Sequence, residues 1–202
     1  MRILTICGSI RPNGLTNTLL EETVDELKKI VPKSEVERIQ ISDVKINVCK
    51  VSCNSVCSNN PYQCVQQDDF QLILNQMKHA DMILLGAPQY FRAPPAQFHV
   101  LIERLVASFF NYECSNPKGE SSPVHGKLCG IIATAEYSNP YVIMEYLADF
   151  CRILKMRNVV LDNFPYLGVA GQRSIEGTEI FHPHQRCKEL AQKLVNLSKV
   201  LQ

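Results

Sequence analysis

Short apolar runs that alternate with amphipathic stretches constrain the fold of this chain more than any other feature. The runs at residues 3–7, 81–87 and 127–135 are strand-sized and carry few polar residues. Strands that are buried on both faces of a parallel sheet have this character. Between the runs, apolar residues recur at spacings of three and four, which predicts helices that pack on the sheet.

Two weaker runs, at residues 35–41 and 159–161, complete a predicted set of five strands alternating with helices. This alternation predicts an α/β fold, a doubly wound five-stranded parallel sheet with helices on both faces. Pro183 suits the first turn of a last helix, and residues 162–181 read as irregular. Since no repeat or boundary divides the sequence, we expect one domain over 1–202, with 46–67 as a cysteine-rich insertion segment.

Composition narrows the classes of protein to which the chain can belong. Its 202 residues suit one domain, and 21 Lys and Arg against 20 Asp and Glu give a net charge of +1. This balance gives no reason to expect a nucleic-acid partner or a membrane surface. No apolar run reaches the roughly 18 residues of a membrane span. The N-terminus enters a strand and lacks a signal-peptide layout, so we expect a cytoplasmic protein.

The loop that follows the first strand, residues 8–18, is suited to hold an anion. It lies between a buried strand and a helix start, where free N–H groups and the positive end of the helix dipole meet. Its hydroxyls and Arg11 add donors and a charge. The P-loop and dinucleotide fingerprints are absent. A low-molecular-weight tyrosine phosphatase needs five residues between its Cys and Arg, whereas three separate Cys7 from Arg11. The alternative is an ordinary turn whose Ser, Thr and Asn cap the helix.

Two further loops follow predicted strands, at residues 88–95 and 134–140. The first contains two aromatic residues, an arginine and three prolines. In a doubly wound sheet, ligands bind beyond the carboxyl ends of the strands, so these loops and 8–18 are expected to form one site.

These loops carry a family resemblance. Residues 8–20 resemble the phosphate loop of the flavodoxin-like, NAD(P)H-dependent FMN reductases, and 86–91 and 134–137 resemble the second and third flavin loops of that family. Residues 64–69 resemble the segment after the cysteine cluster in its iron–sulfur flavoprotein branch. The resemblance runs from Arg2 to about residue 160, and the part from Asp162 onward matches nothing of use.

The resemblance implies a flavodoxin-like fold with bound FMN. Its phosphate would lie on the first loop, with contacts from Ser9, Arg11, Leu15, Thr16, Asn17 and Thr18. Its ring would lie between the other two loops, against Pro88, Gln89, Tyr90, Phe91, Thr134, Ala135, Glu136 and Tyr137. The aromatic side chains offer stacking area. The alternatives are a core-edge or interface pair for Tyr90 and Phe91, and a plain surface loop for Glu136 and Tyr137.

Four of the nine cysteines lie within sixteen residues, at Cys49, Cys53, Cys57 and Cys64. In a chain that is expected to be cytoplasmic, metal binding or redox chemistry explains these cysteines better than disulfides do. Four thiolates match a [4Fe–4S] site, which the resemblance also implies. The gaps of three, three and six residues differ from the two residues typical of that branch between the first cysteines. Zinc or four unbound thiols therefore remain open.

The other cysteines and the histidines give no ligand pattern. Cys7, Cys129 and Cys151 lie in apolar stretches and are predicted to be core residues. Cys114 and Cys187 show no partner in the sequence, and His182 and His184 read as loop residues.

The sequence thus predicts an FMN-dependent oxidoreductase. NAD(P)H would reduce the flavin, which would pass electrons to a quinone-like or other small molecule, or to a protein acceptor. No acid or base side chain is required, because the cofactor does the chemistry. The first alternative is an iron–sulfur flavoprotein electron carrier reduced by a ferredoxin-like protein, and the second is a flavin-binding sensor without turnover. The resemblance also implies a homodimer or homotetramer.

Overall fold

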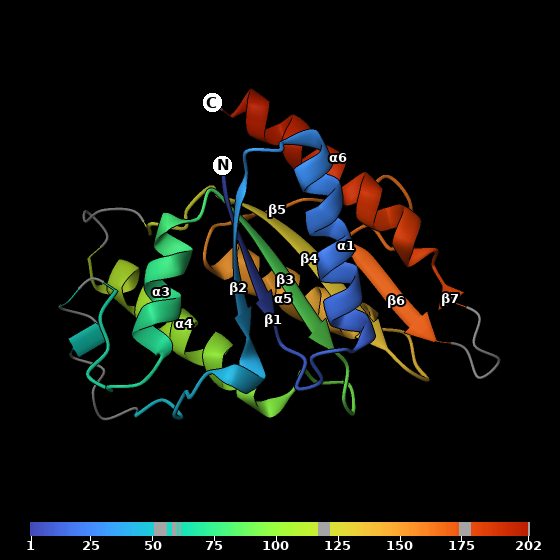
Figure 1. Ribbon diagram of the computed structural model, residues 1–202. Helices are drawn as coiled ribbons and strands as arrows, with labels where there is room; N and C mark the ends of the chain where they lie inside the picture. Colours follow the sequence, from blue (N-terminus) through green and yellow to red (C-terminus); the bar gives the residue numbers. More distant parts are fainter. Residues whose placement is uncertain (51–55, 58–59, 61, 117–121, 174–178, 202) are drawn as a thin grey trace.

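The computed structural model describes residues 1–201 apart from 51–55, 58–59, 61, 117–121 and 174–178. It shows a twisted sheet between two layers of helices (Figure 1). The elements in chain order are β1 (Arg2–Cys7), α1 (Leu15–Ile30), β2 (Glu35–Gln40), the 3₁₀ turn η1 (Ile41–Asp43), α3 (Phe70–His79), β3 (Met82–Pro88), α4 (Ala96–Ser115), β4 (Leu128–Ala135), α5 (Tyr141–Ile153), β5 (Arg157–Asn158), β6 (Val169–Arg173), β7 (Glu179–Ile180) and α6 (Pro183–Val200).

The strands are arranged in the order β2-β1-β3-β4-β6-β7, and β5 pairs with the start of β4. All neighbouring strands are parallel except β6 and β7, which are antiparallel. Since β1 lies between β2 and β3, the chain winds first toward one edge and then toward the other. The predicted flavodoxin-like, doubly wound parallel sheet is confirmed.

Two short strands, β5 and β6, pair with the same side of β4, where the sequence predicts a single fifth strand. The pair Arg157–Asn158 lies beside Leu128 and Cys129, the chain then leaves the sheet, and it returns at Val169 beside Ile132. The predicted strand at 159–161 is therefore wrong, because Val159 and Leu161 are buried in the core without forming a regular strand and Val160 is exposed. The prediction that residues 162–181 have no regular structure is wrong at β6 and β7. At Gly168, a Cβ would lie 2.2 Å from the carbonyl oxygen of Ile131, so only glycine allows this return.

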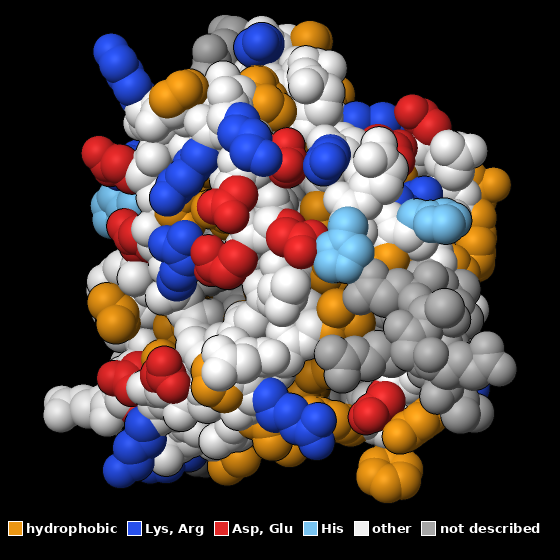
Figure 2. Space-filling view, turned by 45° about the vertical axis from the view of Figure 1, so that its right-hand side comes forward, with side chains coloured by type: hydrophobic (Ala, Val, Ile, Leu, Met, Phe, Trp, Pro, Cys, Tyr) orange, Lys and Arg blue, Asp and Glu red, His pale blue; other side chains and the backbone are white. Residues whose placement is uncertain are grey.

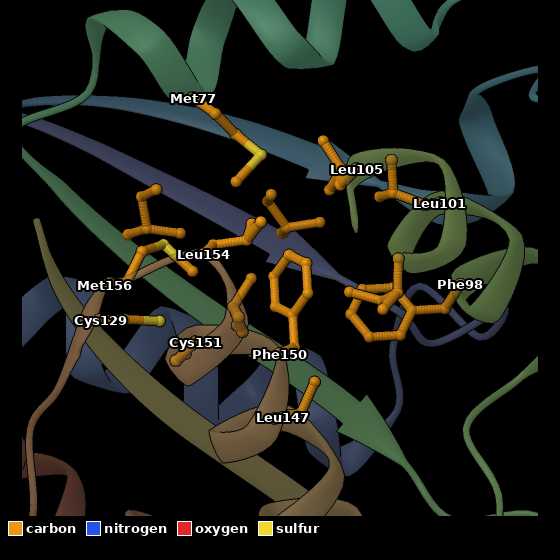
Figure 3. Close-up of a cluster of buried hydrophobic side chains, with 14 of the residues drawn as sticks. Met77, Phe98, Leu101, Leu105, Cys129, Leu147, Phe150, Cys151, Leu154 and Met156 are labelled. Carbon is orange, nitrogen blue, oxygen red and sulfur yellow. The ribbon is translucent and has the colours of Figure 1, made fainter. Parts of the chain in front are cut away.

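Two hydrophobic clusters hold the helices on the two faces of the sheet. One contains residues of α3, α4 and α5, and the other contains residues of α1 and α6. In the first, Cys129 of β4 and Cys151 of α5 lie among apolar side chains such as Phe150 (Figure 3). A hydrogen bond with Cys151, together with the burial of the Cys129 side chain, raises the pKa of Cys129 well above its ordinary value. The prediction that both cysteines belong to the core is confirmed.

The surface carries both charge signs. On the face in Figure 2, basic and acidic side chains are intermixed, and hydrophobic side chains gather along the lower edge of the view. Among the described residues, no helix combines the length and the apolar character that a bilayer crossing needs.

Candidate functional site

A cavity of about 690 Å³ lies where β1, β3 and β4 end. The three loops predicted from the sequence line it together, because parallel strands deliver their carboxyl ends to one edge of the sheet. Its volume is within the range of cofactor and small-molecule sites. Twelve of the predicted flavin-site residues line it: Ser9, Arg11, Leu15, Thr16, Pro88, Gln89, Tyr90, Phe91, Thr134, Ala135, Glu136 and Tyr137. Ile10, Pro12, Asn13, Gly14 and Ser138 line it as well.

The first wall is the loop before α1 together with the N-terminus of that helix. The N-cap residue is Gly14, which has no side chain that could accept a hydrogen bond from the first turn. The first backbone hydrogen bond into the helix runs from Thr18 N to Gly14 O, at 3.1 Å. The N–H groups of residues 15–17 therefore lack acceptors within the helix, and the dipole makes this end favourable for an anion.

Ser9 shapes this loop from inside. It is 3% exposed, and its hydroxyl donates to the carbonyl oxygen of Arg11 and accepts from the N–H of Arg11, both at 3.1 Å. The Arg11 guanidinium itself is exposed and has no hydrogen bond or ion pair with the residues that the structure describes. Arg11 is consequently available to a ligand in the cavity, whereas Ser9 is already used by the loop.

Asn17 and Thr18 do not line the cavity. Asn17 donates from Nδ2 to Gln40 Oε1 at 2.9 Å and also to the carbonyl oxygen of Pro12, while Thr18 Oγ1 donates to Gly14 O at 3.4 Å. Gln40, at the end of β2, also donates to the carbonyl oxygen of Ser9. Gln40 is not among the residues predicted from the sequence, although its place at the carboxyl end of a predicted strand is a usable signal.

The second wall is a tight turn after β3. Tyr90 and Ala93 exchange backbone hydrogen bonds of 2.8 and 2.9 Å, and the residues between them, Phe91 and Arg92, have φ values of 49° and 64°. Left-handed backbone is costly for such side chains, and strain of this kind is concentrated at functional sites. The turn leaves Phe91 fully exposed at the rim of the cavity. Phe91 is therefore not a core-edge residue.

The third wall follows β4 and is tied to the other two. Thr134 Oγ1 and Thr16 Oγ1 are 2.7 Å apart in a buried hydrogen bond, and Gln89 N donates to Thr134 O at 2.7 Å. Gln89 Nε2 donates to Ser138 Oγ at 2.5 Å, but the Oε1 atom of Gln89 is buried without a hydrogen-bond partner among the described residues. A buried acceptor without a donor is costly, and Gln89 is one of the residues that line the cavity. Tyr137 lines the cavity and is 75% exposed.

Cys7 closes β1 near these loops, but it is a poor nucleophile. Burial is the main reason that the pKa of its thiol is raised to about 11, so the reactive thiolate is scarce near neutral pH. A cysteine nucleophile needs a lowered thiol pKa, so this environment gives no support for phosphatase chemistry at Cys7.

None of the described residues of the cysteine-rich segment 46–67 lines this cavity. Cys49 and Cys64 are half-buried and Cys57 is buried, while Cys53 lies outside the described residues. Among the residues described, no three Cys, His, Asp or Glu side chains are grouped as a metal site. Beside Cys64, Asp68 and Arg104 form an ion pair of 2.5 Å. Burial opposes both charges, but their hydrogen bond holds the pKa of Asp68 below its ordinary value and the pKa of Arg104 above it.

The chain is similar to known proteins in sequence and in fold. The model of the NADPH-dependent FMN reductase family matches residues 1–165. An iron–sulfur flavoprotein of Methanocaldococcus jannaschii is 34% identical over 119 residues, which span 59% of this chain and 59% of that protein. An iron–sulfur flavoprotein of Archaeoglobus fulgidus is 29% identical over 205 residues, covering 98% of this chain and 96% of that protein.

Among solved structures, that of RosB with a bound 8-demethyl-8-formylriboflavin-5'-phosphate has the same fold. Its TM-score is 0.74 at 14% identity, and the match covers 100% of this chain and 80% of RosB.

Proposed function

Since the chain belongs to the NADPH-dependent FMN reductase family, we propose that it is an FMN-dependent oxidoreductase that binds FMN in the cavity at the carboxyl ends of β1, β3 and β4. The observation that carries this proposal is the open N-terminus of α1 beside Arg11, which has no partner in the described part of the chain, in a cavity whose other walls carry exposed aromatic residues. One end of the cavity suits a phosphate and the other suits a planar ring.

The phosphate would be held by the N–H groups of residues 15–17 and by Arg11. The hydroxyls of Ser9, Thr16 and Thr18 and the amide of Asn17 already have partners within the protein. Their proposed role is therefore to fix the loop and the helix start rather than to supply most of the binding. Backbone N–H groups at a helix N-terminus, joined by one arginine, are a sufficient anion site.

The ring would lie between residues 88–91 and 134–137. Gln89 Oε1, buried and unpaired among the described residues, would accept a hydrogen bond from an N–H group of the ring. Tyr90, Phe91 and Tyr137 would supply apolar contact on the open side. When bound, FMN supplies the hydride and electron chemistry, and this chain contributes binding, orientation and exclusion of water.

We propose NAD(P)H as the donor, supported by the name of the matching family, and a quinone-like small molecule or a protein as the acceptor. The test is anaerobic mixing of the FMN-loaded full-length chain with NADPH or NADH. Loss of flavin absorbance within seconds is the expected result. If dithionite reduces the flavin but neither nucleotide does so within minutes, the NAD(P)H reductase proposal is wrong.

An iron–sulfur flavoprotein electron carrier, reduced by a ferredoxin-like protein, is the second candidate. It is favoured by the four-cysteine segment and by the relatives, which are iron–sulfur flavoproteins. The donor set fits a [4Fe–4S] cluster in chemistry and number, since Cys49, Cys53, Cys57 and Cys64 provide four thiols. Because the described cysteines are not grouped, cluster binding would have to draw them together, and binding free energy would order the segment.

Iron, sulfide and zinc analysis of anaerobically reconstituted protein tests the cluster. Four iron and four sulfide per chain are expected. Stoichiometric zinc without sulfide, or no metal at all, would leave a flavin oxidoreductase without a cluster.

A further inference from the structure

Arg104 is a buried arginine that contacts two described residues of the cysteine-rich segment, Asn47 and Cys64. It belongs to α4, and its side chain is only 1% exposed. Its guanidinium lies over the ring of Phe70, with Cζ 4.1 Å from the ring centroid. Burying a guanidinium is costly unless its donors are used, so the partners of this side chain show what it is for.

Those partners lie at both ends of the segment and inside it. Nη1 donates to Asp68 Oδ2 at 2.5 Å and to the carbonyl oxygen of Asn47 at 3.1 Å. Nη2 donates to the sulfur of Cys64 at 3.1 Å. One side chain therefore joins the entry of the segment, its exit and one of its four cysteines.

The hydrogen bond from Arg104 to the Cys64 sulfur is not needed to compensate the buried charge. Asp68 already neutralises the guanidinium, and Asn47 uses a further N–H. A neutral thiol is a weak acceptor, whereas a metal-bound thiolate carries negative charge and accepts strongly. A buried charged donor aimed at Cys64 is thus matched to a ligating sulfur.

We propose that Arg104 is a positioning residue for the iron–sulfur cluster, an inference that rests on the proposed cluster at Cys49, Cys53, Cys57 and Cys64. By donating to the Cys64 sulfur, Arg104 fixes the orientation of that ligand and makes the cluster easier to reduce, because hydrogen bonds to the sulfurs help to set cluster potentials. Since Asp68 compensates the charge of Arg104, the effect acts through the hydrogen bond at short range.

The experiment is a redox titration, followed by EPR, of the reconstituted full-length chain with Arg104→Lys. Lysine keeps the charge and can still reach Asp68, but it lacks the planar fork that serves Asp68 and Cys64 together. The matched control is Arg186→Lys in α6. Arg186 is also buried, but it donates to the carbonyl oxygens of Asn163 and Pro165.

We expect Arg104→Lys to shift the reduction equilibrium of the cluster at least tenfold toward the oxidised form, which is 59 mV for a one-electron couple. The flavin potential of Arg104→Lys should be unchanged, and so should the cluster potential of Arg186→Lys. Equal cluster potentials in the wild type and Arg104→Lys would overturn the inference while leaving the cluster in place. A wild-type protein without iron and sulfide would instead overturn the proposed cluster.

A second measurement covers the case in which Arg104→Lys does not fold. The reduced wild-type protein, labelled with guanidinium-¹⁵N arginine, is examined by pulsed EPR. A ¹⁵N coupling to the cluster is expected from a guanidinium nitrogen 3.1 Å from the Cys64 sulfur. Its absence would overturn the inference without any variant.

Discussion

Replacing Arg11 by alanine should separate recognition of the FMN phosphate from recognition of the flavin ring. The Arg11 guanidinium has no partner among the described residues, so its removal leaves no protein group unpaired. The loss should therefore equal the contact with the ligand. An exposed ion pair contributes about 0.2–1 kcal/mol, and a charge-assisted hydrogen bond contributes about 1.5–3 kcal/mol.

Arg11 lines the cavity but stays exposed, so we expect the variant to lose about 1.5 kcal/mol of binding free energy for FMN. This loss is roughly a tenfold increase in the Kd for FMN. Riboflavin, which has no phosphate, should lose less than about twofold in affinity. Calorimetric titration of the flavin-free protein with each ligand measures both values. The loss for FMN should shrink as salt is added, because screening weakens exposed charges.

Arg2→Ala is the matched control. It removes the same charge at the opposite end of β1, where Arg2 lies 3.9 Å from Asp81. It should leave both affinities unchanged. Equal losses for FMN and riboflavin in Arg11→Ala would refute the assignment of the phosphate to this loop.

Three further predictions concern stability and metal content. Lys127→Met should lower the free energy of unfolding by about 1–3 kcal/mol in urea denaturation, because Lys127 Nζ donates to the carbonyl oxygens of Met77, Lys78 and Ala80 at the end of α3. An unchanged midpoint would contradict this role. Asp68→Asn should cost about 3 kcal/mol at pH 7, since it breaks the buried pair with Arg104. The folded-state pKa of Asp68 is lowered, so its contribution is present above about pH 4 and is lost as the pH falls further; the difference between variant and wild type should narrow there. A gap that is constant down to pH 2 would contradict this. Cys129→Ser should leave the iron content of reconstituted protein unchanged, because Cys129 lies in the core; a loss of iron would place it at the cluster.

The sequence was informative where apolar pattern and topology act together. Buried parallel strands have a recognisable composition, and their carboxyl ends must meet at one edge of the sheet. That is why loops at Ser9, Gln89 and Glu136, far apart along the chain, could be predicted to line one site. The limit of this reasoning is visible at Asn17 and Thr18, whose polar groups the protein uses internally.

The sequence was uninformative where the function of a residue depends on distant partners. Arg104 contacts groups 36 to 57 residues away, and arginine within a helix is normally exposed, so nothing in the pattern marks it as buried. Val159 and Leu161 were misread because burial in the core and burial in a sheet require the same apolar side chains. The single-domain organisation, the cytoplasmic location and the homodimeric or homotetrameric assembly stay predictions.

The most direct test of the central claim is a crystal structure of the full-length chain with FMN. The account predicts that the phosphate lies within hydrogen-bonding distance of the N–H groups of residues 15–17 and of Arg11, with the ring between residues 88–91 and 134–137. A phosphate away from the N-terminus of α1, or a ring outside the cavity, would contradict it.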